Sequence, residues 1–137
     1  MELQVGVKAL LKNLEGKYLV LKRSAKKYQD VKGDLWDIVG GRIEPGTTLV
    51  ENLKREVREE VGLELLDSPK LVGAQDILKV PGRHVVRLTY TANISGEPKL
   101  NSDHTDFKWL ILEEMKQFAD LDVYFKELLE KGLFDND

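Results

Sequence analysis

Short runs of apolar residues, separated by polar turns, recur along most of the chain. They lie at residues 5–11, 17–22, 35–39, 70–78, 84–94 and 107–112. Runs of this length that are rich in Val, Leu, Ile and Tyr favour β-strands. The first two runs flank a polar turn at residues 13–16 that ends in glycine, and this spacing predicts a β-hairpin.

A different period covers residues 48–62. Apolar side chains recur here every four residues, at Leu49, Leu53, Val57 and Val61. This spacing places them on one face of a helix, and we expect that face to be buried. Thr48 is a suitable N-cap, Glu51 three residues later completes a capping-box pattern, and Gly62 is a natural C-terminal stop.

A second helical pattern spans residues 123–131 and stops at Gly132. The elements therefore follow in the order strands, helix, strands, helix. This order predicts an α/β (α+β) fold, in which helices pack on a mixed central sheet. The chain has 137 residues and shows no repeat, low-complexity tract or linker, so we expect a single domain over residues 1–137.

Composition narrows the functional classes. The net charge of −3 leaves no basic footprint for binding a nucleic-acid polymer. Cysteine is absent, which excludes disulfides and thiolate metal sites. The N-terminus lacks the basic and apolar regions of a signal peptide, and no run approaches the roughly 18 apolar residues that span a bilayer. We therefore expect a soluble cytoplasmic protein, a monomer or a homodimer, with no membrane partner.

Three carboxylates on the predicted helix are the most informative side chains. Glu56, Glu59 and Glu60 are three and four residues apart, so they stack on one face of the helix, away from the apolar stripe. Like charges at this spacing destabilise a helix by about 0.2–0.5 kcal/mol per pair. A divalent cation between them would turn repulsion into ligation, and carboxylate oxygens suit Mg²⁺ or Mn²⁺. The alternatives are an acidic face in contact with water or with a protein partner.

The residues around these acids resemble the Nudix box, the signature motif of the Nudix hydrolase family. In its usual form the box reads Gly, five residues, Glu, seven residues, then Arg-Glu-apolar-any-Glu-Glu-any-Gly-apolar. The fixed positions match at Gly41, Arg55, Glu56, Glu59, Glu60 and Gly62, with Val57 and Leu63 at the apolar sites. The first glutamate of the box is replaced by Thr47, and we expect this change to affect the loop and the start of the helix modestly.

The resemblance implies an α/β/α sandwich and magnesium-dependent hydrolysis of a pyrophosphate bond in a nucleoside diphosphate linked to another moiety. It implies metal ligands at Glu56 and Glu60, with Glu59 as a third ligand or as a group that orients the attacking water. A backbone carbonyl at Gly40 or Gly41 would complete the coordination. A tight turn explains the two glycines equally well, and both explanations can hold together.

By the same resemblance, Arg55 orients the catalytic glutamates through ion pairs, for which its planar guanidinium is suited. The alternative for Arg55 is a residue on the surface. Glu44, in the loop before the helix, is expected to hydrogen-bond to Arg55, to approach the metal, or to be a solvated loop acid.

Many family members take a further acid, often the general base, from a loop near a late strand. The candidates here are Asp103, which we favour, and Asp106. His104 between them titrates near neutral pH and could also accept a proton. The alternative is a polar turn before a strand.

Two residues outside the box are candidates for substrate contact. Arg23 follows the second strand and could contact phosphate, and Trp36 precedes the Gly-Gly pair and could stack on a base. An aromatic residue before a turn is also typical of a protein core. A loop with three lysines could attract phosphate or be solvated: Lys26, Lys27 and Lys32.

Within the family, the short single domain and residues 35–37 before the Gly-Gly pair resemble nucleoside triphosphate pyrophosphohydrolases of the MutT type. Many of those have a proline where this chain has Val39. ADP-ribose and other sugar nucleotides are alternative small-molecule substrates, because the residues that select the substrate lie outside the box. A non-catalytic nucleotide-binding module is a further alternative, although such modules usually lose box glutamates that this chain retains. For an enzyme, we expect activity to require Mg²⁺ or Mn²⁺ and to rise toward alkaline pH.

Overall fold

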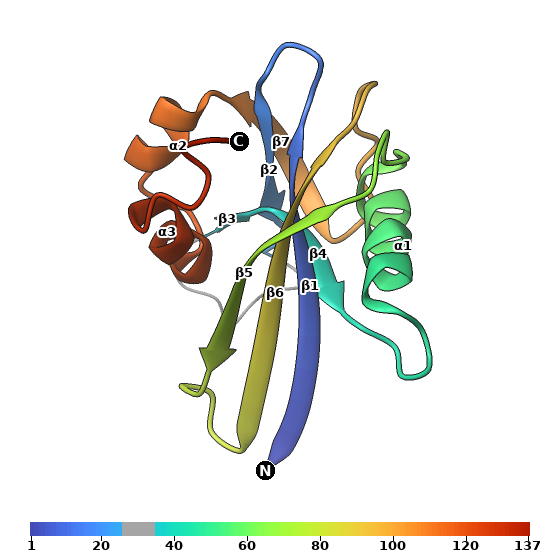
Figure 1. Ribbon diagram of the computed structural model, residues 1–137, viewed down its shortest axis with the longest axis vertical. Coiled ribbons are helices and arrows are strands. Elements are labelled where there is room, and N and C mark those ends of the chain that lie inside the picture. The colour runs from blue at the N-terminus through green and yellow to red at the C-terminus, as the bar shows by residue number, and fades with distance from the viewer. Residues whose placement is uncertain (26–34) are drawn as a thin grey trace.

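The computed structural model describes residues 1–25 and 35–137, and it shows a sheet between two layers of helices (Figure 1). The strands are β1 (Glu2–Lys12), β2 (Tyr18–Arg23), β3 (Trp36–Asp37), β4 (Val39–Arg42), β5 (Lys70–Ile77), β6 (Arg83–Asn93) and β7 (His104–Leu110). The helices are α1 (Leu49–Val61), α2 (Leu112–Gln117) and α3 (Val123–Glu130). The predicted loop with Lys26, Lys27 and Lys32 lies outside the described residues.

Strand pairing makes the sheet mixed, as predicted. The seven-stranded sheet has the order β3-β2-β1-β6-β5, with β4 paired to β1 and β7 paired to β2. β1 runs parallel to β6 over its whole length, beginning with Glu2 opposite Arg83, whereas its pairs with β2 and β4 are antiparallel. The predicted hairpin is formed by β1 and β2. In Figure 1, α1 lies on one side of the sheet and α2 and α3 on the other, which confirms the α/β/α arrangement.

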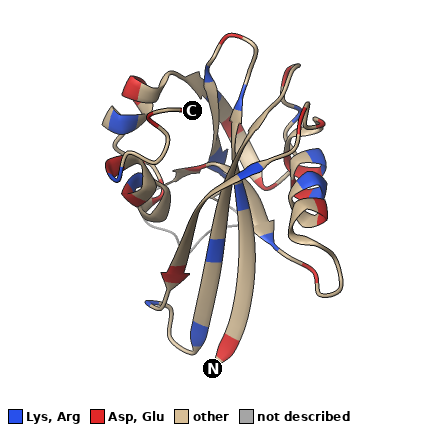
Figure 2. Cartoon of the chain, viewed as in Figure 1, with Lys and Arg blue, Asp and Glu red and all other residues tan. Residues whose placement is uncertain are grey.

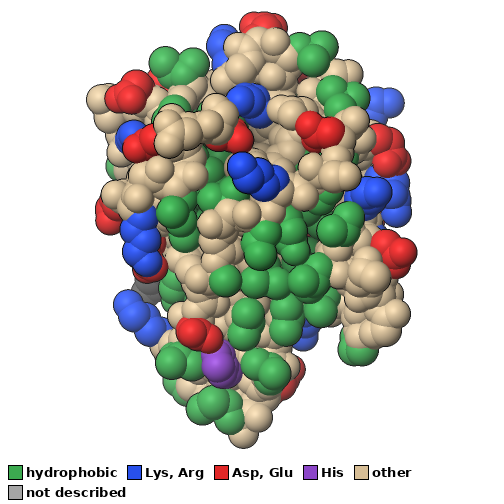
Figure 3. Space-filling view, viewed as in Figure 1, with side chains coloured by type: hydrophobic (Ala, Val, Ile, Leu, Met, Phe, Trp, Pro, Cys, Tyr) green, Lys and Arg blue, Asp and Glu red, His purple; other side chains and the backbone are tan. Residues whose placement is uncertain are grey.

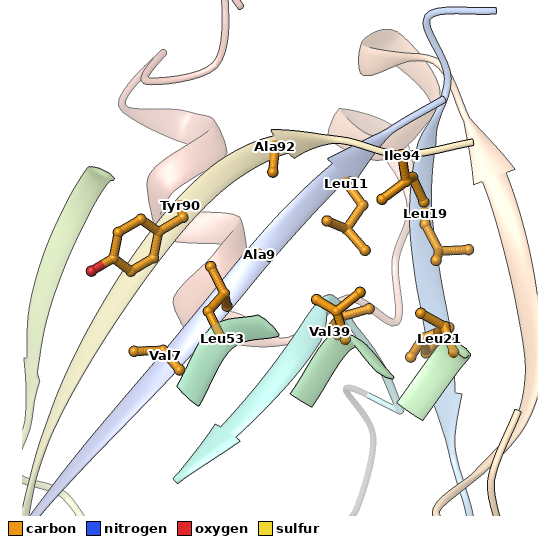
Figure 4. Close-up of a cluster of buried hydrophobic side chains, with 12 residues drawn as sticks. Val7, Ala9, Leu11, Leu19, Leu21, Val39, Leu53, Tyr90, Ala92 and Ile94 are labelled. Atoms are coloured by element: carbon orange, nitrogen blue, oxygen red, sulfur yellow. The ribbon is translucent and has the colours of Figure 1, made fainter. Parts of the chain in front are cut away.

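Alternation along β1 divides the core into two clusters. Val7 and Leu11 belong to the cluster on the side of α1, where they lie with Leu53 (Figure 4). Leu10 belongs to the second cluster, which contains Phe125 of α3. Complete burial of a side chain of this size contributes about 1.5–3 kcal/mol. The two clusters therefore hold α1 and α3 on opposite faces of the same sheet.

The predicted central helix is α1, and its N-cap and its C-terminal stop are confirmed. The hydroxyl of Thr48 accepts a hydrogen bond from the backbone N–H of Glu51 at 3.1 Å. Gly62 ends the helix in the left-handed region, with a φ of 67°. The predicted stripe is buried, with exposed fractions of 0% at Leu53, Val57 and Val61. Capping and packing thus fix both ends of the helix that carries the acids.

One strand boundary, at the Gly-Gly pair, differs from the one that the sequence predicts. The sequence predicts that the segment 35–39 stops there, but the chain continues as β4 through Arg42. Gly40 and Gly41 form regular antiparallel pairs with β1. Pairing with a long neighbouring strand therefore overrides the tendency of glycine to end a strand.

A second difference from the sequence prediction is the end of the last strand, β7. The run predicted as a strand over residues 107–112 is divided, because β7 ends at Leu110 and α2 begins at Leu112. The carboxylate of Glu114 accepts a hydrogen bond from the backbone N–H of Ile111 at 2.9 Å. The sequence does not reveal α2, because Ile111 stands where Ser, Thr, Asp or Asn would mark a helix start.

The sheet face beside α1 is only partly covered. Hydrophobic side chains gather over β1, β6 and β5 in the view of Figure 3. Leu3, at the start of β1, keeps 65% of its surface exposed. Within the described part of the chain, none of the helices is both long and apolar enough to cross a membrane.

Candidate active site

Two glycines of β4 let the carboxylates of α1 approach the sheet closely. Gly40 lies opposite Lys8 and Gly41 lies opposite Val7 in the pairing of β4 with β1. Gly40 has a φ of 145°, and a side chain there would collide with the carbonyl oxygen of Val7. A Cβ at Gly41 would lie 2.9 Å from a carboxylate oxygen of Glu56. Both positions therefore require glycine, one for its backbone and one for the approach of Glu56.

Glu56 and Glu60 form a largely buried pair beneath β4. Their side chains are 13% and 5% exposed. Glu60 Oε2 accepts a hydrogen bond from the backbone N–H of Gly40 at 3.2 Å. Burial raises the pKa of Glu60 to about 9, and its hydrogen bond with Glu56 adds to that rise. Glu60 is thus not on a face away from the apolar stripe, as the sequence indicated; it follows Val57 by three residues and lies at the border of the stripe.

Arg55 is the cation nearest to this pair along α1, where acidic and basic residues adjoin in Figure 2. Its Nη1 lies 3.0 Å from Glu56 Oε1 and 3.4 Å from Glu59 Oε2. The same nitrogen lies 3.8 Å from Glu44 Oε1. These contacts are the ion pairs that the sequence led us to expect, and a planar guanidinium suits several carboxylates at once.

The donor set fits a divalent cation. Two carboxylates in contact, one of them buried, oppose each other as anions, and this raises the pKa of Glu60. A cation between them would remove the opposition, and carboxylate oxygens are the ligands that Mg²⁺ prefers. Among residues 1–25 and 35–137, however, no three His, Asp or Glu side chains converge as a preformed metal centre. Glu59 turns toward Arg55 instead and is 55% exposed.

The pattern of residues across this site matches one protein family along nearly the whole chain. A model of the NUDIX domain matches residues 2–131. The chain belongs to the Nudix family of hydrolases. It is 31% identical over 130 residues to nucleoside triphosphatase NudI of Escherichia coli strain K12, covering 87% of this chain and 90% of that protein.

Solved structures agree with this membership. The MutT protein from Methanosarcina mazei Go1 superimposes with a TM-score of 0.84 at 26% identity, covering 98% of this chain and 96% of that one. The ORF135 protein of E. coli gives a TM-score of 0.78 at 27% identity, covering 100% and 96% of the two chains. These two proteins therefore share the fold of this chain along nearly its whole length.

Asn52 is a residue of the Nudix helix that the sequence analysis missed. It is fully buried, and its Nδ2 donates to the carbonyl oxygens of Thr47 and Thr48 at 3.1 and 2.8 Å. Its Oδ1 accepts from the backbone N–H of Glu44 at 2.8 Å and from Arg55 Nη2 at 2.9 Å. Thr47, which replaces the first box glutamate, thus belongs to a loop that Asn52 ties to α1. The signal available in the sequence was an amide side chain one turn after the predicted N-cap, Thr48.

The loop before β7 brings His104 to the acidic pair. His104 Nε2 lies 3.8 Å from Glu60 Oε1. Burial lowers the pKa of His104 to about 4, Lys8 adds to the lowering, and Asp103 opposes it. Asp103 holds the loop through its backbone, since its carbonyl oxygen accepts from the N–H of Ser24 at 2.8 Å. The carboxylate of Asp106 is exposed and accepts from the next backbone N–H, but the residue lies within β7, opposite Lys22 of β2, and not in the expected polar turn.

Trp36 and Arg23, the two residues predicted to contact substrate, contact other side chains of the protein. Trp36 is 7% exposed in the second core cluster, where its ring meets Phe118 edge-on with centroids 5.6 Å apart. This burial favours the core alternative over stacking on a base. Arg23 Nη2 lies 2.8 Å from Asp37 and 3.0 Å from Asp122, so these two carboxylates engage the guanidinium predicted to contact phosphate.

Arg23 belongs to a buried ring of four charges that the sequence analysis missed. Arg87 closes it, lying 3.2 Å from Asp37 and 3.0 Å from Asp122. We call Arg23, Asp37, Arg87 and Asp122 the ion ring. Asp37 is 2% exposed, and a charged residue inside the apolar run 35–39 was the available signal. The ring joins β2, β3, β6 and the start of α3.

Proposed function

We propose that this Nudix hydrolase is a Mg²⁺-dependent nucleoside triphosphate pyrophosphohydrolase. The observation that carries the proposal is the Glu56–Glu60 pair, which lies against the two glycines of β4 and is held by Arg55. An acidic site binds a polyanionic pyrophosphate only together with cations, because like charges repel. The similarity to a nucleoside triphosphatase over 90% of that protein's length supports the choice of substrate class.

Different residues of the site have different roles in the proposed reaction. Glu56 and Glu60 would hold Mg²⁺, with the carbonyl oxygen of Gly40 as a further donor, Glu59 as the alternative third ligand and Mn²⁺ as a substitute. Bound there, the cation would supply positive charge that neutralises the phosphates and polarises the phosphorus under attack. Arg55 keeps Glu56 and Glu59 in place through its contacts at 3.0 and 3.4 Å.

Proton transfer needs an acceptor that water can reach. Glu59 has a side chain that is 55% exposed and fixed at one end by Arg55, so we assign it this role. Asp103, in the loop before β7, is the alternative acceptor. His104 is neutral at pH 7 because burial lowers its pKa to about 4, and it packs against Glu60 without adding charge to the site.

The test is a phosphate-release screen with magnesium over nucleoside triphosphates, oxidised purine triphosphates, ADP-ribose, sugar nucleotides and dinucleotide polyphosphates. We expect pyrophosphate from at least one triphosphate and no turnover in excess chelator. Glu60→Gln should lower kcat by about 100-fold or more, because a single electrostatic contact in the transition state has that effect. Glu51→Gln is the matched control, since Glu51 is exposed on the same helix.

Other outcomes would contradict the proposal in different ways. Phosphate released only after added phosphatase, from ADP-ribose or a sugar nucleotide, would assign the protein to diphosphate-linked substrates. Nucleotide binding without any turnover, unchanged in Glu60→Gln, would indicate a binding module. Undiminished turnover in excess chelator would rule out the metal requirement.

A further inference from the structure

A cavity of about 250 Å³ lies beside the acidic pair, on the other side of β4. Gly6 helps to leave it open, because it has no side chain to fill it. Its polar lining comes from Gln4, Lys8, Arg42 and Arg87. Three cationic side chains around one cavity are an environment for an anion. None of these four polar residues occupies a fixed position of the Nudix box.

Arg87 already contacts both aspartates of the ion ring through its two terminal nitrogens. Each aspartate of the ring has two arginine partners, at distances from 2.8 to 3.2 Å. The ring is therefore closed without any further cation. Lys8 nevertheless adds a third cation to Asp37, with Nζ 3.0 Å from Oδ2.

Lys8 reaches from the ion ring toward the acidic pair. Its stem passes so close to Gly40 that an added Cβ there would lie 2.8 Å from Lys8 Cδ. Its Nζ also donates to the carbonyl oxygen of Ile38 at 3.4 Å. Gly40, against which this stem lies, also donates its backbone N–H to Glu60 Oε2 at 3.2 Å, so one residue of β4 contacts both Lys8 and the acidic pair. The side chain is 19% exposed, more than either arginine of the ring.

We propose that Lys8 is a phosphate-binding residue, whose ammonium holds a phosphate of the substrate beside the acidic pair. This inference rests on the proposed function, and it places the pyrophosphate between α1 and the cavity. Asp37 keeps its two arginine partners when the ammonium turns to a phosphate, so no carboxylate is left unpaired. An ammonium on a flexible stem suits a phosphate whose position changes between substrate and product. Arg42, across Gly6 in the same cavity, is the second cation available to the phosphates.

The experiment compares Lys8→Met with Lys12→Met. Methionine keeps the length of the stem that packs on Gly40 and removes only the charge. Lys12 is a matched control, because it lies on the same strand, is 26% exposed and pairs with an aspartate, Asp137, at 3.7 Å. The probe is imidodiphosphate with Mg²⁺, a pyrophosphate analogue that is not hydrolysed, measured by calorimetry. Steady-state kinetics on the triphosphate that the wild type hydrolyses provide the second readout.

We expect Lys8→Met to weaken imidodiphosphate binding and to raise KM by about 10- to 100-fold, as for loss of a hydrogen bond to a charged group. The change in kcat should be smaller. Lys8→Arg should restore most of the affinity, and Lys12→Met should match the wild type. A merely structural role would lower the melting temperature of Lys8→Met and leave the affinity of the folded protein unchanged.

Other results separate this inference from the proposed function. Wild-type affinity in Lys8→Met, an equal loss in Lys12→Met, or no binding by the wild type would each overturn the role of Lys8. Binding by the wild type that depends on Lys8, without hydrolysis of any nucleotide, would retain the phosphate site and reject the enzymatic proposal. If Lys8→Met does not fold, Lys8→Gln takes its place with the same expected loss.

Discussion

Glu56 lies so close to Gly41 that the geometry of the acidic pair depends on the absence of one methyl group. A Cβ at Gly41 would meet three atoms of the Glu56 carboxyl group at 2.9–3.0 Å. The backbone at Gly41 is not in the left-handed region, so alanine is compatible with the strand itself. The effect of a substitution should therefore be transmitted to Glu56 rather than to the fold.

We expect Gly41→Ala to lower kcat/KM by about 100-fold, the scale for displacing a catalytic group by an ångström. The melting temperature should change little. The double variant Gly41→Ala with Glu56→Gln should be no worse than Glu56→Gln alone, because both changes act on one carboxylate. Additive losses in kinetics would show that Gly41 acts by another route.

At the scale of the element, α1 is held at its start by a buried amide as well as by its N-cap. Asn52 makes hydrogen bonds with the loop at Glu44, Thr47 and Thr48 and with Arg55. The loop before the helix and the arginine that holds the acids thus share one partner. A change at Asn52 should be felt both in stability and in turnover.

We expect Asn52→Ala to lower the free energy of unfolding by about 1–3 kcal/mol, because buried groups lose their partners. Turnover should fall as well, since Arg55 loses the acceptor at 2.9 Å that fixes its second nitrogen. Thr48→Ala is the control: it removes the N-cap, at about 1 kcal/mol, without touching Arg55. Urea unfolding and steady-state kinetics measure the two effects. Equal kinetic losses in both variants would show that helix stability alone controls activity.

At the scale of the whole molecule, the ion ring joins segments that are distant in sequence. Asp122 accepts hydrogen bonds from the backbone N–H groups of Tyr124 and Phe125 at 3.1 Å, so the ring also caps α3. Burial alone would raise the pKa of Asp37, but Arg87, Lys8 and Arg23 outweigh it and hold that pKa well below its usual range. The folded state therefore binds a proton at Asp37 less readily than the unfolded chain does.

The sign of the pH effect follows from this depressed pKa. The stabilisation by Asp37 is present above the ordinary aspartate pKa of about 4 and is lost as the pH falls below it. We expect the free energy of unfolding to fall as the pH is lowered from about 5 to about 2, a range that begins near the ordinary pKa of aspartate. Asp37→Asn should be destabilised by about 3–5 kcal/mol at pH 7, because it leaves Lys8, Arg23 and Arg87 with Asp122 as the one remaining carboxylate of the ring, and its acid dependence should be weaker. Urea unfolding across this range provides the test, and equal acid dependence in both proteins would contradict it.

Local signals account for what the sequence predicted well. Thr48 and Gly62 mark α1 because capping needs only neighbouring residues, and the spacing of Glu56 and Glu60 brings them together on any helix. The burial of Glu60 was missed because it depends on how closely β4 approaches. Asp37 was missed as part of a ring because its arginine partners come from β2 and β6. Pairings across the sheet are not encoded in any short window of residues.

The parallel pairing of β1 with β6 has a consequence for synthesis of the protein. Each residue of β1 finds its parallel neighbour only at residues 83–93, so the strand made first is completed on that side by one made late. Closing so long a loop has an entropic cost that local hairpins and helices avoid, and contacts of this range slow folding. While the chain emerges from the ribosome, α1 can form early, but β1 cannot complete its place in the sheet. The carboxylates of a nascent chain are thus made before the sheet on which α1 packs is complete.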